Sequence, residues 1–269
     1  MPDLDLIADI AAAAEAEDGA APLDEATWRA LRHHPETVQS WTSEDGVALV
    51  IGDQLSLVVR PSARGRGIAT ALLADVPDGE LSAWSHGDHP AAAALARSRG
   101  FERVRSLWVM RLATSTALPE LAVPPGLTIR PYVTSDADDI VRVNAAAFAH
   151  HPEQGAMDAA ELAERMAEPW FDPAGLLLAT EAERVLGFHW TKQHSPDLGE
   201  VYVVGIDPAA QGRGLGKLLT LAGLHHLAGL GVAEILLYVE SDNAPAVAVY
   251  SGLGFTHADA DTHVMYRRD

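Results

Sequence analysis

The sequence predicts an α+β fold that is built twice, each time as a mixed, mostly antiparallel sheet with helices on both faces. Short runs rich in Val, Leu and Ile, typical of strands, alternate with longer runs typical of helices. One glycine-rich turn occurs twice with a similar context, and a proline-containing segment separates the two occurrences. We therefore expect a first domain over residues 1–113, a linker over 114–126 and a second domain over 127–269.

Length and composition agree with this organisation. The 269 residues suit two domains of about 130, and 48% hydrophobic residues suffice for two packed cores. A net charge of −19 disfavours general attraction to nucleic acid or to an anionic membrane surface. The N-terminus lacks a basic segment, and no apolar run reaches the length of a membrane span. We expect a soluble, cytoplasmic protein that is a monomer.

The absence of cysteine limits the chemistry. It excludes disulfides, zinc–thiolate sites and a cysteinyl acyl-enzyme. The adjacent histidines of pairs such as His225-His226 point to different faces of a helix, and no His-Glu-x-x-His run occurs. We expect no metal.

The first copy begins with helices and continues with short strands. An alanine-rich helix runs from Leu4 to Glu17 and stops at Asp18-Gly19, and a second helix begins near Asp24 and continues through Arg32. Strands, a glycine-rich turn and further helices follow. These elements are strands at Val38 to Trp41, Val47 to Ile51 and Leu55 to Val59, a helix at Thr70 to Ala74 and a helix ending at Ser98.

The second copy repeats this order at greater length. The expected elements are a strand at Leu127 to Tyr132, helices from Ser135 to Phe148 and Asp158 to Ala167, strands at Gly175 to Thr180, Val185 to Gln193 and Glu200 to Ile206, a helix at Lys217 to Leu230, a strand at Glu234 to Glu240, a helix at Asn243 to Leu253 and a last strand at Thr262 to Arg267.

The glycine-rich turn of the second copy, Gln211 to Gly216, stands between a predicted strand and a predicted helix. Such a turn lets backbone N–H groups converge on an anion at the positive end of the helix, which indicates a phosphate site. A dinucleotide fingerprint would need glycine at Lys217, and a P-loop would need Ser or Thr at Leu218. Neither pattern fits.

The turn resembles the pyrophosphate loop [Gln/Arg]-x-x-Gly-x-[Gly/Ala] of the Gcn5-related N-acetyltransferases (GNAT) at its three fixed positions. The first copy repeats the pattern, and Ser98 to Phe101 matches Gly252 to Phe255 at nearly the same distance from its own loop. The matched loop positions are Pro61 with Pro208, Arg64 with Gln211, Gly67 with Gly214 and Ala69 with Gly216.

Acetyl transfer from a thioester to an amine needs a base and an acid besides the pyrophosphate anchor. Period-2 alternation predicts Glu200, Tyr202 and Val204 on one face of a strand that leads to the loop, which favours Glu200 as general base through a water. Tyr250 suits the protonation of a thiolate, and the residue aligned with it in the first copy is Ala96. A solvated carboxylate and a core tyrosine are the alternatives.

Longer strings narrow the resemblance to the mycothiol synthase family, tandem acetyltransferases that acetylate the cysteinyl amine of cysteinyl-glucosaminyl-inositol. The resemblance is strongest over the second copy and thinner over the first. The strings are His151 to Gly155, Trp170 to Pro173, Gly187 to Lys192, Gly199 to Val203, Leu237 to Asn243 and, in the first copy, Asp18 to Pro22 with Glu25.

The resemblance implies acetyl-CoA as co-substrate and assigns site residues. It implies acetyl-CoA contacts in the second copy at Val204, Gly205, Ile206, Gln211, Gly212, Arg213, Gly214, Leu215, Gly216, Lys217, Asn243, Ala244, Pro245, Ala246, Val247 and Ala248, and a cofactor in the non-catalytic first copy at Leu57, Val58, Val59, Gly65, Arg66, Gly67, Ile68, Ala69 and Thr70. The sugar-cysteine substrate would meet Glu25, Glu153, Lys192, Glu200 and Tyr238, with Glu200 as base and Tyr250 as acid.

Two other functions remain open from the sequence. One is a GNAT enzyme acting on another small amine or on a peptide N-terminus. The other is a noncatalytic sensor that uses both loops only to bind acyl-CoA. Glu25 has a structural alternative as well, because an acidic residue in the first turn of a helix is favourable without any ligand.

Overall fold

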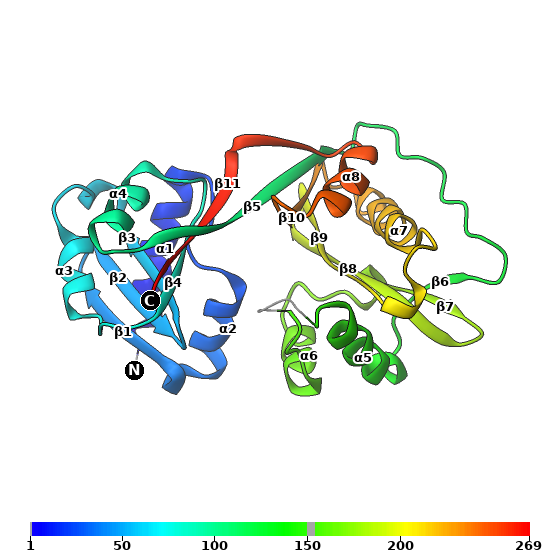
Figure 1. Ribbon diagram of the computed structural model, residues 1–269, viewed down its shortest axis with the longest axis horizontal. Coiled ribbons are helices and arrows are strands. Elements are labelled where there is room, and N and C mark those ends of the chain that lie inside the picture. The colour runs from blue at the N-terminus through cyan, green and yellow to red at the C-terminus, as the bar shows by residue number, and fades with distance from the viewer. Residues whose placement is uncertain (1, 150–153) are drawn as a thin grey trace. The chain divides into compact units, whose positions relative to one another are not determined.

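The computed structural model describes residues 2–149 and 154–269 and divides into two compact units (Figure 1). Unit 1 contains the chain up to Trp108 together with Ala258–Asp269, and unit 2 is Val109–His257. The chain passes between the units inside β5 (Glu102–Ala113) and again inside β11 (Thr256–Arg268). The expected division at a single linker therefore differs from the compact units, since the last strand contributes to unit 1.

Unit 1 is a sheet in the order β1-β2-β3-β4-β11 with four helices. β3 and β4 are parallel, whereas β4 and β11 are antiparallel with Val264 opposite Ser85. Its other elements are α1 (Leu4–Asp18), α2 (Glu25–His33), β1 (Val38–Ser43), β2 (Gly46–Ile51), β3 (Gln54–Val59), α3 (Ile68–Asp75), β4 (Leu81–Ser85) and α4 (Pro90–Ser98).

Both faces of the unit 1 sheet are covered. On one face α1 and α2 pack Ile7, Ile10 and Leu31 against the strands. On the other face Leu72 of α3 packs with Phe101 and with residues of β2, β3, β4 and β11. Burial of these apolar side chains, at about 25 cal/mol per Å² removed from water, is what holds the helices on the sheet.

Unit 2 has the strand order β5-β10-β9-β8-β7-β6. β9 and β10 are parallel, and the pairs β6–β7, β7–β8 and β8–β9 are antiparallel. Its elements are β6 (Thr128–Pro131), α5 (Ala137–Ala147), α6 (Ala159–Met166), β7 (Leu176–Glu181), β8 (Arg184–Ser195), β9 (Leu198–Ile206), α7 (Leu215–Gly229), β10 (Glu234–Glu240) and α8 (Ala244–Gly252).

In unit 2, α5 and α6 lie on one face of the sheet and α7 lies on the other (Figure 1). Ile140, Leu162 and Trp190 belong to the core under α5 and α6. The face under α7 includes Leu215, which packs with Leu186. None of the described helices combines the length and the apolar character needed to cross a membrane.

The α+β class with helices on both faces is confirmed, and most predicted elements agree with the structure to within a few residues. Residues 114–126, the predicted linker, form no helix or strand and belong to unit 2. Two strands escaped prediction: β4 and β5. β11 is also longer than the predicted strand at Thr262 to Arg267.

Helix α7 and strand β8 approach closely at one buried contact. His189 is fully buried, and its Nδ1 donates to the carbonyl of Leu219 at 2.8 Å. A Cβ atom on Gly223 would lie 2.0 Å from the His189 ring. Gly223 is therefore what allows the imidazole to fit under the helix.

We expect Gly223→Ala to destabilise the protein by about 1–3 kcal/mol, because the added methyl group overlaps a buried ring. Gly229→Ala in the same helix is the control, since a Cβ there meets no atom within 4 Å and alanine suits a helix better by roughly 0.5–1 kcal/mol. Urea unfolding of both variants measures the difference. Equal stability of the two variants would contradict the packing described.

Burial of His189 also predicts a pH dependence. Desolvation lowers the pKa of His189 to about 4, against an ordinary value of 6.5. Between these values the unfolded chain binds a proton that the folded chain does not, so stability falls as pH decreases, by about 3 kcal/mol over the full interval. Urea unfolding at pH 7 and 4.5 should show a smaller loss for His189→Gln than for the native chain. His225→Gln, at an exposed position, should keep the native slope.

Candidate functional site

The parallel strands β9 and β10 separate along their length. Their pairing runs from Leu198↔Glu234 to Val201↔Leu237. Both strands continue, to Ile206 and Glu240, beyond the last of these pairs. A separation of this kind turns backbone N–H and C=O groups of the two strands toward the space between them, where an extended ligand can pair with them.

A β-bulge lies in the same part of β9. Thr191 pairs with Val201 and Trp190 with Val203, which leaves Tyr202 as the additional residue. Tyr202 and Val203 consequently pack in the same core under α5 and α6. The prediction that Tyr202 and Val204 share a face is wrong, because the bulge shifts the alternation by one residue.

The loop after β9 has the backbone that a phosphate site requires. Gly212 and Gly214 have φ values of 77° and 76°, in the left-handed region, and a Cβ on either residue would meet no atom within 4 Å. Gly214 is the N-cap of α7 and no side chain caps that end. The first N–H groups of a 15-residue helix are thus available to an anion at its positive end.

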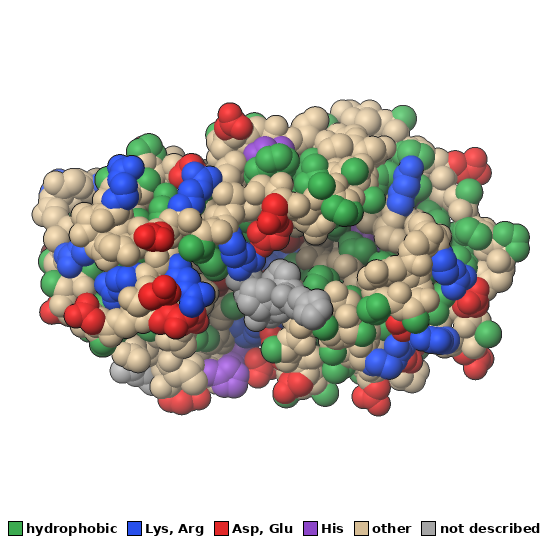
Figure 2. Space-filling model, in the orientation of Figure 1, with side chains coloured by type: hydrophobic (Ala, Val, Ile, Leu, Met, Phe, Trp, Pro, Cys, Tyr) green, Lys and Arg blue, Asp and Glu red, His purple; other side chains and the backbone are tan. Residues whose placement is uncertain are grey.

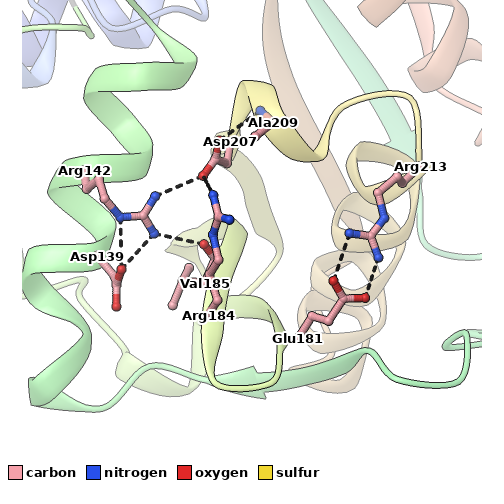
Figure 3. A network of polar contacts seen from close by, with 8 residues as sticks. All are labelled: Asp139, Arg142, Glu181, Arg184, Val185, Asp207, Ala209 and Arg213. Atoms are coloured by element: carbon pink, nitrogen blue, oxygen red, sulfur yellow. Dashed lines mark hydrogen bonds and ion pairs between the residues drawn. The ribbon is translucent and has the colours of Figure 1, made fainter.

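Ion pairs fix the chain where it enters this loop. Figure 3 shows Arg142 from α5 and Arg184 from the start of β8 converging on the carboxylate of Asp207, at 3.0 and 3.1 Å. The second oxygen of Asp207 accepts from the N–H of Ala209, and these three donors lower the pKa of Asp207, the backbone N–H most. The carboxylate therefore stays charged and anchors the loop to two other elements.

Arg213, within the loop, makes a two-point contact with Glu181 at the end of β7 (Figure 3). The distances are 2.7 and 3.2 Å, and both side chains are about 40% exposed. Leu215 is buried in the core under α7, so only its backbone faces the loop. The loop thus presents backbone donors at its centre and a cation at its rim.

Glu200 is buried in β9, one residue before the last pair between β9 and β10. Its Oε2 lies 2.6 Å from Nε2 of His194, whose side chain is 32% exposed, against 7% for Glu200. The pair connects a buried carboxylate to a group that reaches solvent. A carboxylate with such a neighbour can accept a proton and pass it outward.

Lys192 lies directly opposite Glu200 in the β8–β9 ladder, so the two side chains share a face of the sheet. The Lys192 ammonium is 4.6 Å from the centre of the Trp170 ring and 5.4 Å from that of Tyr202. Such cation–π contacts hold a lysine over aromatic faces. The side chain is thereby fixed beside Glu200.

Tyr250 is on α8, the helix that follows β10. Its ring packs edge-on against buried Phe255, with the ring centres 6.0 Å apart. Desolvation raises the pKa of Tyr250 above its ordinary value of 10, so the phenol is protonated at neutral pH. It has the protonation state that an acid requires.

The remaining predicted residues lie in several settings. Tyr238 follows the last β9–β10 pair and is 43% exposed. Asn243 caps α8: its side-chain oxygen accepts a hydrogen bond from the backbone N–H of Ala246. Glu25 is the first residue of α2 in unit 1 and pairs with Arg29 at 3.8 Å, which agrees with its structural alternative. Glu153 lies outside the described residues.

Unit 1 contains a second strand separation at the equivalent position. β3 and β4 pair through Gln54↔Ser82 and then diverge. Gln54 and Val201, the last paired residues of the two first strands, are 147 positions apart (201 − 54), as are Gly67 and Gly214 (214 − 67). The separation and the loop therefore keep the same spacing in both units.

A pocket of about 490 Å³ opens where β3 and β4 diverge. Its volume lies within the range of small-molecule sites. The loop glycines Gly65 and Gly67 have φ values of 75° and 82°, and α3 begins without a side-chain cap. The pocket is lined by most of the predicted residues, namely Leu57, Val58, Val59, Gly65, Gly67, Ile68, Ala69 and Thr70, whereas Arg66 is not among them and donates to the carbonyl of Ser62.

The residue that anchors the loop has the opposite charge in unit 1. Arg60 stands where unit 2 has Asp207, 147 positions later (207 − 60). Arg60 pairs with Asp9 of α1 at 2.6 Å and with Asp45 at the β1–β2 turn at 3.3 Å. Unit 1 thus uses a central cation with two acids where unit 2 uses a central acid with two cations.

The described part of unit 1 differs from unit 2 at the hairpin beside the strand separation. Its β2–β3 hairpin is shorter, with six residues in each strand against twelve and nine in β8 and β9. The position equivalent to Glu200 is Asp53, which is exposed in the hairpin turn. The short hairpin therefore leaves no buried carboxylate beside the strand separation.

Sequence reasoning missed His194 and the aromatic contacts of Lys192. His194 lies six residues before Glu200 across a hairpin whose register is set by the bulge, so only three-dimensional pairing reveals it.

In the part of the chain that the structure describes, no three His, Asp or Glu side chains are grouped to hold a metal ion. Lys and Arg side chains on the face drawn in Figure 2 are interspersed with acidic ones and form no continuous basic patch.

Comparison with known proteins supports an acyltransferase site. Residues 144–255 match the Acetyltransferase (GNAT) family. The chain is 68% identical to the mycothiol acetyltransferase of Nocardioides sp. strain JS614, covering 97% of this chain and 96% of that protein. It is 46% identical to the mycothiol acetyltransferase of Pseudarthrobacter chlorophenolicus, covering 96% and 90%. A solved tandem GNAT protein from the clavulanic acid biosynthesis pathway has a TM-score of 0.72 at 20% identity, covering 99% of this chain and 95% of that one, and shares its fold.

Proposed function

The chain belongs to the mycothiol acetyltransferase family, and from this premise we propose that it transfers the acetyl group of acetyl-CoA to the cysteinyl amine of cysteinyl-glucosaminyl-inositol. The products are mycothiol and CoA. The observation that carries the proposal is the position of a buried carboxylate, Glu200, one residue before β9 and β10 separate and on the strand that leads to the phosphate loop.

Acetyl-CoA binds along β9 and at the start of α7. The pyrophosphate takes the N–H groups of the loop from Gln211 to Lys217, whose left-handed glycines leave space for it. The pantetheine arm pairs with backbone groups of Val204 to Ile206, which lie beyond the last β9–β10 pair. Because the bulge at Tyr202 redirects β9 at this point, the thioester reaches the edge of the Glu200 site.

Glu200 acts as the general base, through a water, and Tyr250 as the general acid. The amine nitrogen forms a bond to the acetyl carbon as Glu200 takes its proton, and the carbon–sulfur bond breaks as Tyr250 protonates the departing thiolate. Burial of Tyr250 supports this assignment because its raised pKa keeps the phenol protonated. His194 transfers the proton from Glu200 toward solvent.

The hydroxyl-rich acceptor binds beside Glu200. Lys192, held over Trp170 and Tyr202, and Tyr238 on β10 supply donors for sugar or inositol oxygens. Competition among cysteinyl-glucosaminyl-inositol, other small amines and peptide N-termini tests this choice, and preference for another amine would replace the acceptor while keeping the reaction.

We expect Glu200→Gln and Tyr250→Phe each to lower kcat by roughly 10²- to 10⁴-fold, the usual contribution of a general base or acid. Their affinity for acetyl-CoA should remain close to native, because neither change removes a phosphate donor. CoA release and equilibrium binding measure the two quantities. Glu234→Gln, on the neighbouring strand with a side chain 41% exposed, and Tyr132→Phe are matched controls that should retain native kcat.

The two phosphate loops should respond differently to the same change. Gly214→Glu places a carboxylate in the loop of unit 2 and should abolish turnover by repelling the pyrophosphate. Gly67→Glu has the same backbone conformation and the same open surroundings, so it imposes similar strain, yet it should mainly reduce the number of CoA molecules bound per chain from two to one. Equal loss of turnover in both variants would contradict a non-catalytic unit 1.

A further inference from the structure

A second, smaller cavity of unit 1 adjoins its ligand pocket. The first cavity, the outer pocket, contains the phosphate loop, and the second, the chamber, of about 90 Å³, is lined by residues that include Leu55, Leu73, Ala96 and Phe101. The two cavities share Leu57, Trp84, Ser85, Ala92 and Leu95. A ligand in the outer pocket can therefore extend into the chamber.

The acyl end of a CoA thioester would face this chamber. β3 runs from Gln54 to Val59 and leads directly to the phosphate loop. Leu55, near the end of β3 away from the loop, lines the chamber, Leu57 lines both cavities, and the loop residues Gly65 and Gly67 line only the outer pocket. A ligand that fixes its pyrophosphate at the loop and extends back along β3 therefore brings its acyl group to the chamber.

Ala96 explains why the chamber is present in unit 1. The N–H of Phe101 donates to the carbonyl of Ala96, and the N–H of Phe255 donates to the carbonyl of Tyr250, so the two residues occupy the same position in the two units. A methyl group stands in unit 1 where a phenol ring stands in unit 2. Most of the remaining lining is apolar, with Ser85 and Arg99 as the polar members apart from Tyr266.

We propose that unit 1 binds an acyl-CoA whose unbranched acyl chain is longer than acetyl and occupies this chamber. The inference rests on the proposed binding of a CoA thioester in unit 1. The volume is about three times the share of one water molecule in the liquid, about 30 Å³, which suits a chain of a few carbons such as butyryl. Each methylene buried there should tighten binding roughly fourfold.

The experiment measures equilibrium binding to the full chain in the Gly214→Glu background, which removes binding at unit 2. CoA, acetyl-CoA and butyryl-CoA are titrated calorimetrically. Butyryl-CoA, with two more methylenes, should bind roughly fifteenfold more tightly than acetyl-CoA.

Ala96→Tyr should remove the preference for butyryl over acetyl while retaining acetyl-CoA binding, and Ala94→Tyr, at an exposed position of the same helix, should retain the preference. If butyryl-CoA binds no more tightly than acetyl-CoA, the proposal that the acyl chain occupies the chamber is wrong, although unit 1 can still bind CoA. If none of the three ligands binds in the Gly214→Glu background, the proposed CoA site of unit 1 itself fails. The comparison of acetyl-CoA with butyryl-CoA tests the proposal even if the Ala96→Tyr variant does not fold.

Discussion

The separation of two parallel strands is the constraint on which both units depend. A parallel pair that stayed hydrogen-bonded would leave no backbone groups for an extended ligand and no space between the strands. In unit 2 the pairing ends at Val201↔Leu237, and in unit 1 at Gln54↔Ser82. The glycine loop follows the first strand of each pair, so the ligand path and the phosphate site are joined by a single short segment.

The two units differ in the residues and the hairpin that lie beside the strand separation. The longer β8–β9 hairpin carries Glu200 into the sheet beside Lys192, whereas the shorter hairpin of unit 1 leaves Asp53 exposed. At the other side, Tyr250 fills the position that Ala96 leaves open. These differences underlie the proposal of proton transfer in unit 2 and of ligand binding alone in unit 1.

The sequence could predict the features that are local. The loop, its repetition and most helices follow from glycines, caps and periodicity within short windows. β4 and β5 escaped because neither has a clean alternation, and the transfer of β11 to unit 1 depends on its pairing with β4, far away in the chain. The bulge at Tyr202 and the His194–Glu200 contact depend on the register of two strands, which no single strand encodes.

The inverted charges at the loop entrance indicate what the repeated architecture requires. Arg60 joins the loop entrance to Asp9 on α1 and Asp45 in the β1–β2 turn, and Asp207 joins it to Arg142 on α5 and Arg184 at the start of β8, with the opposite signs. A role in binding a phosphate directly would favour one sign in both units, since a carboxylate repels an anion. These residues therefore act by fixing where the loop begins, and the proposed phosphate site consists of the backbone N–H groups that follow in both units.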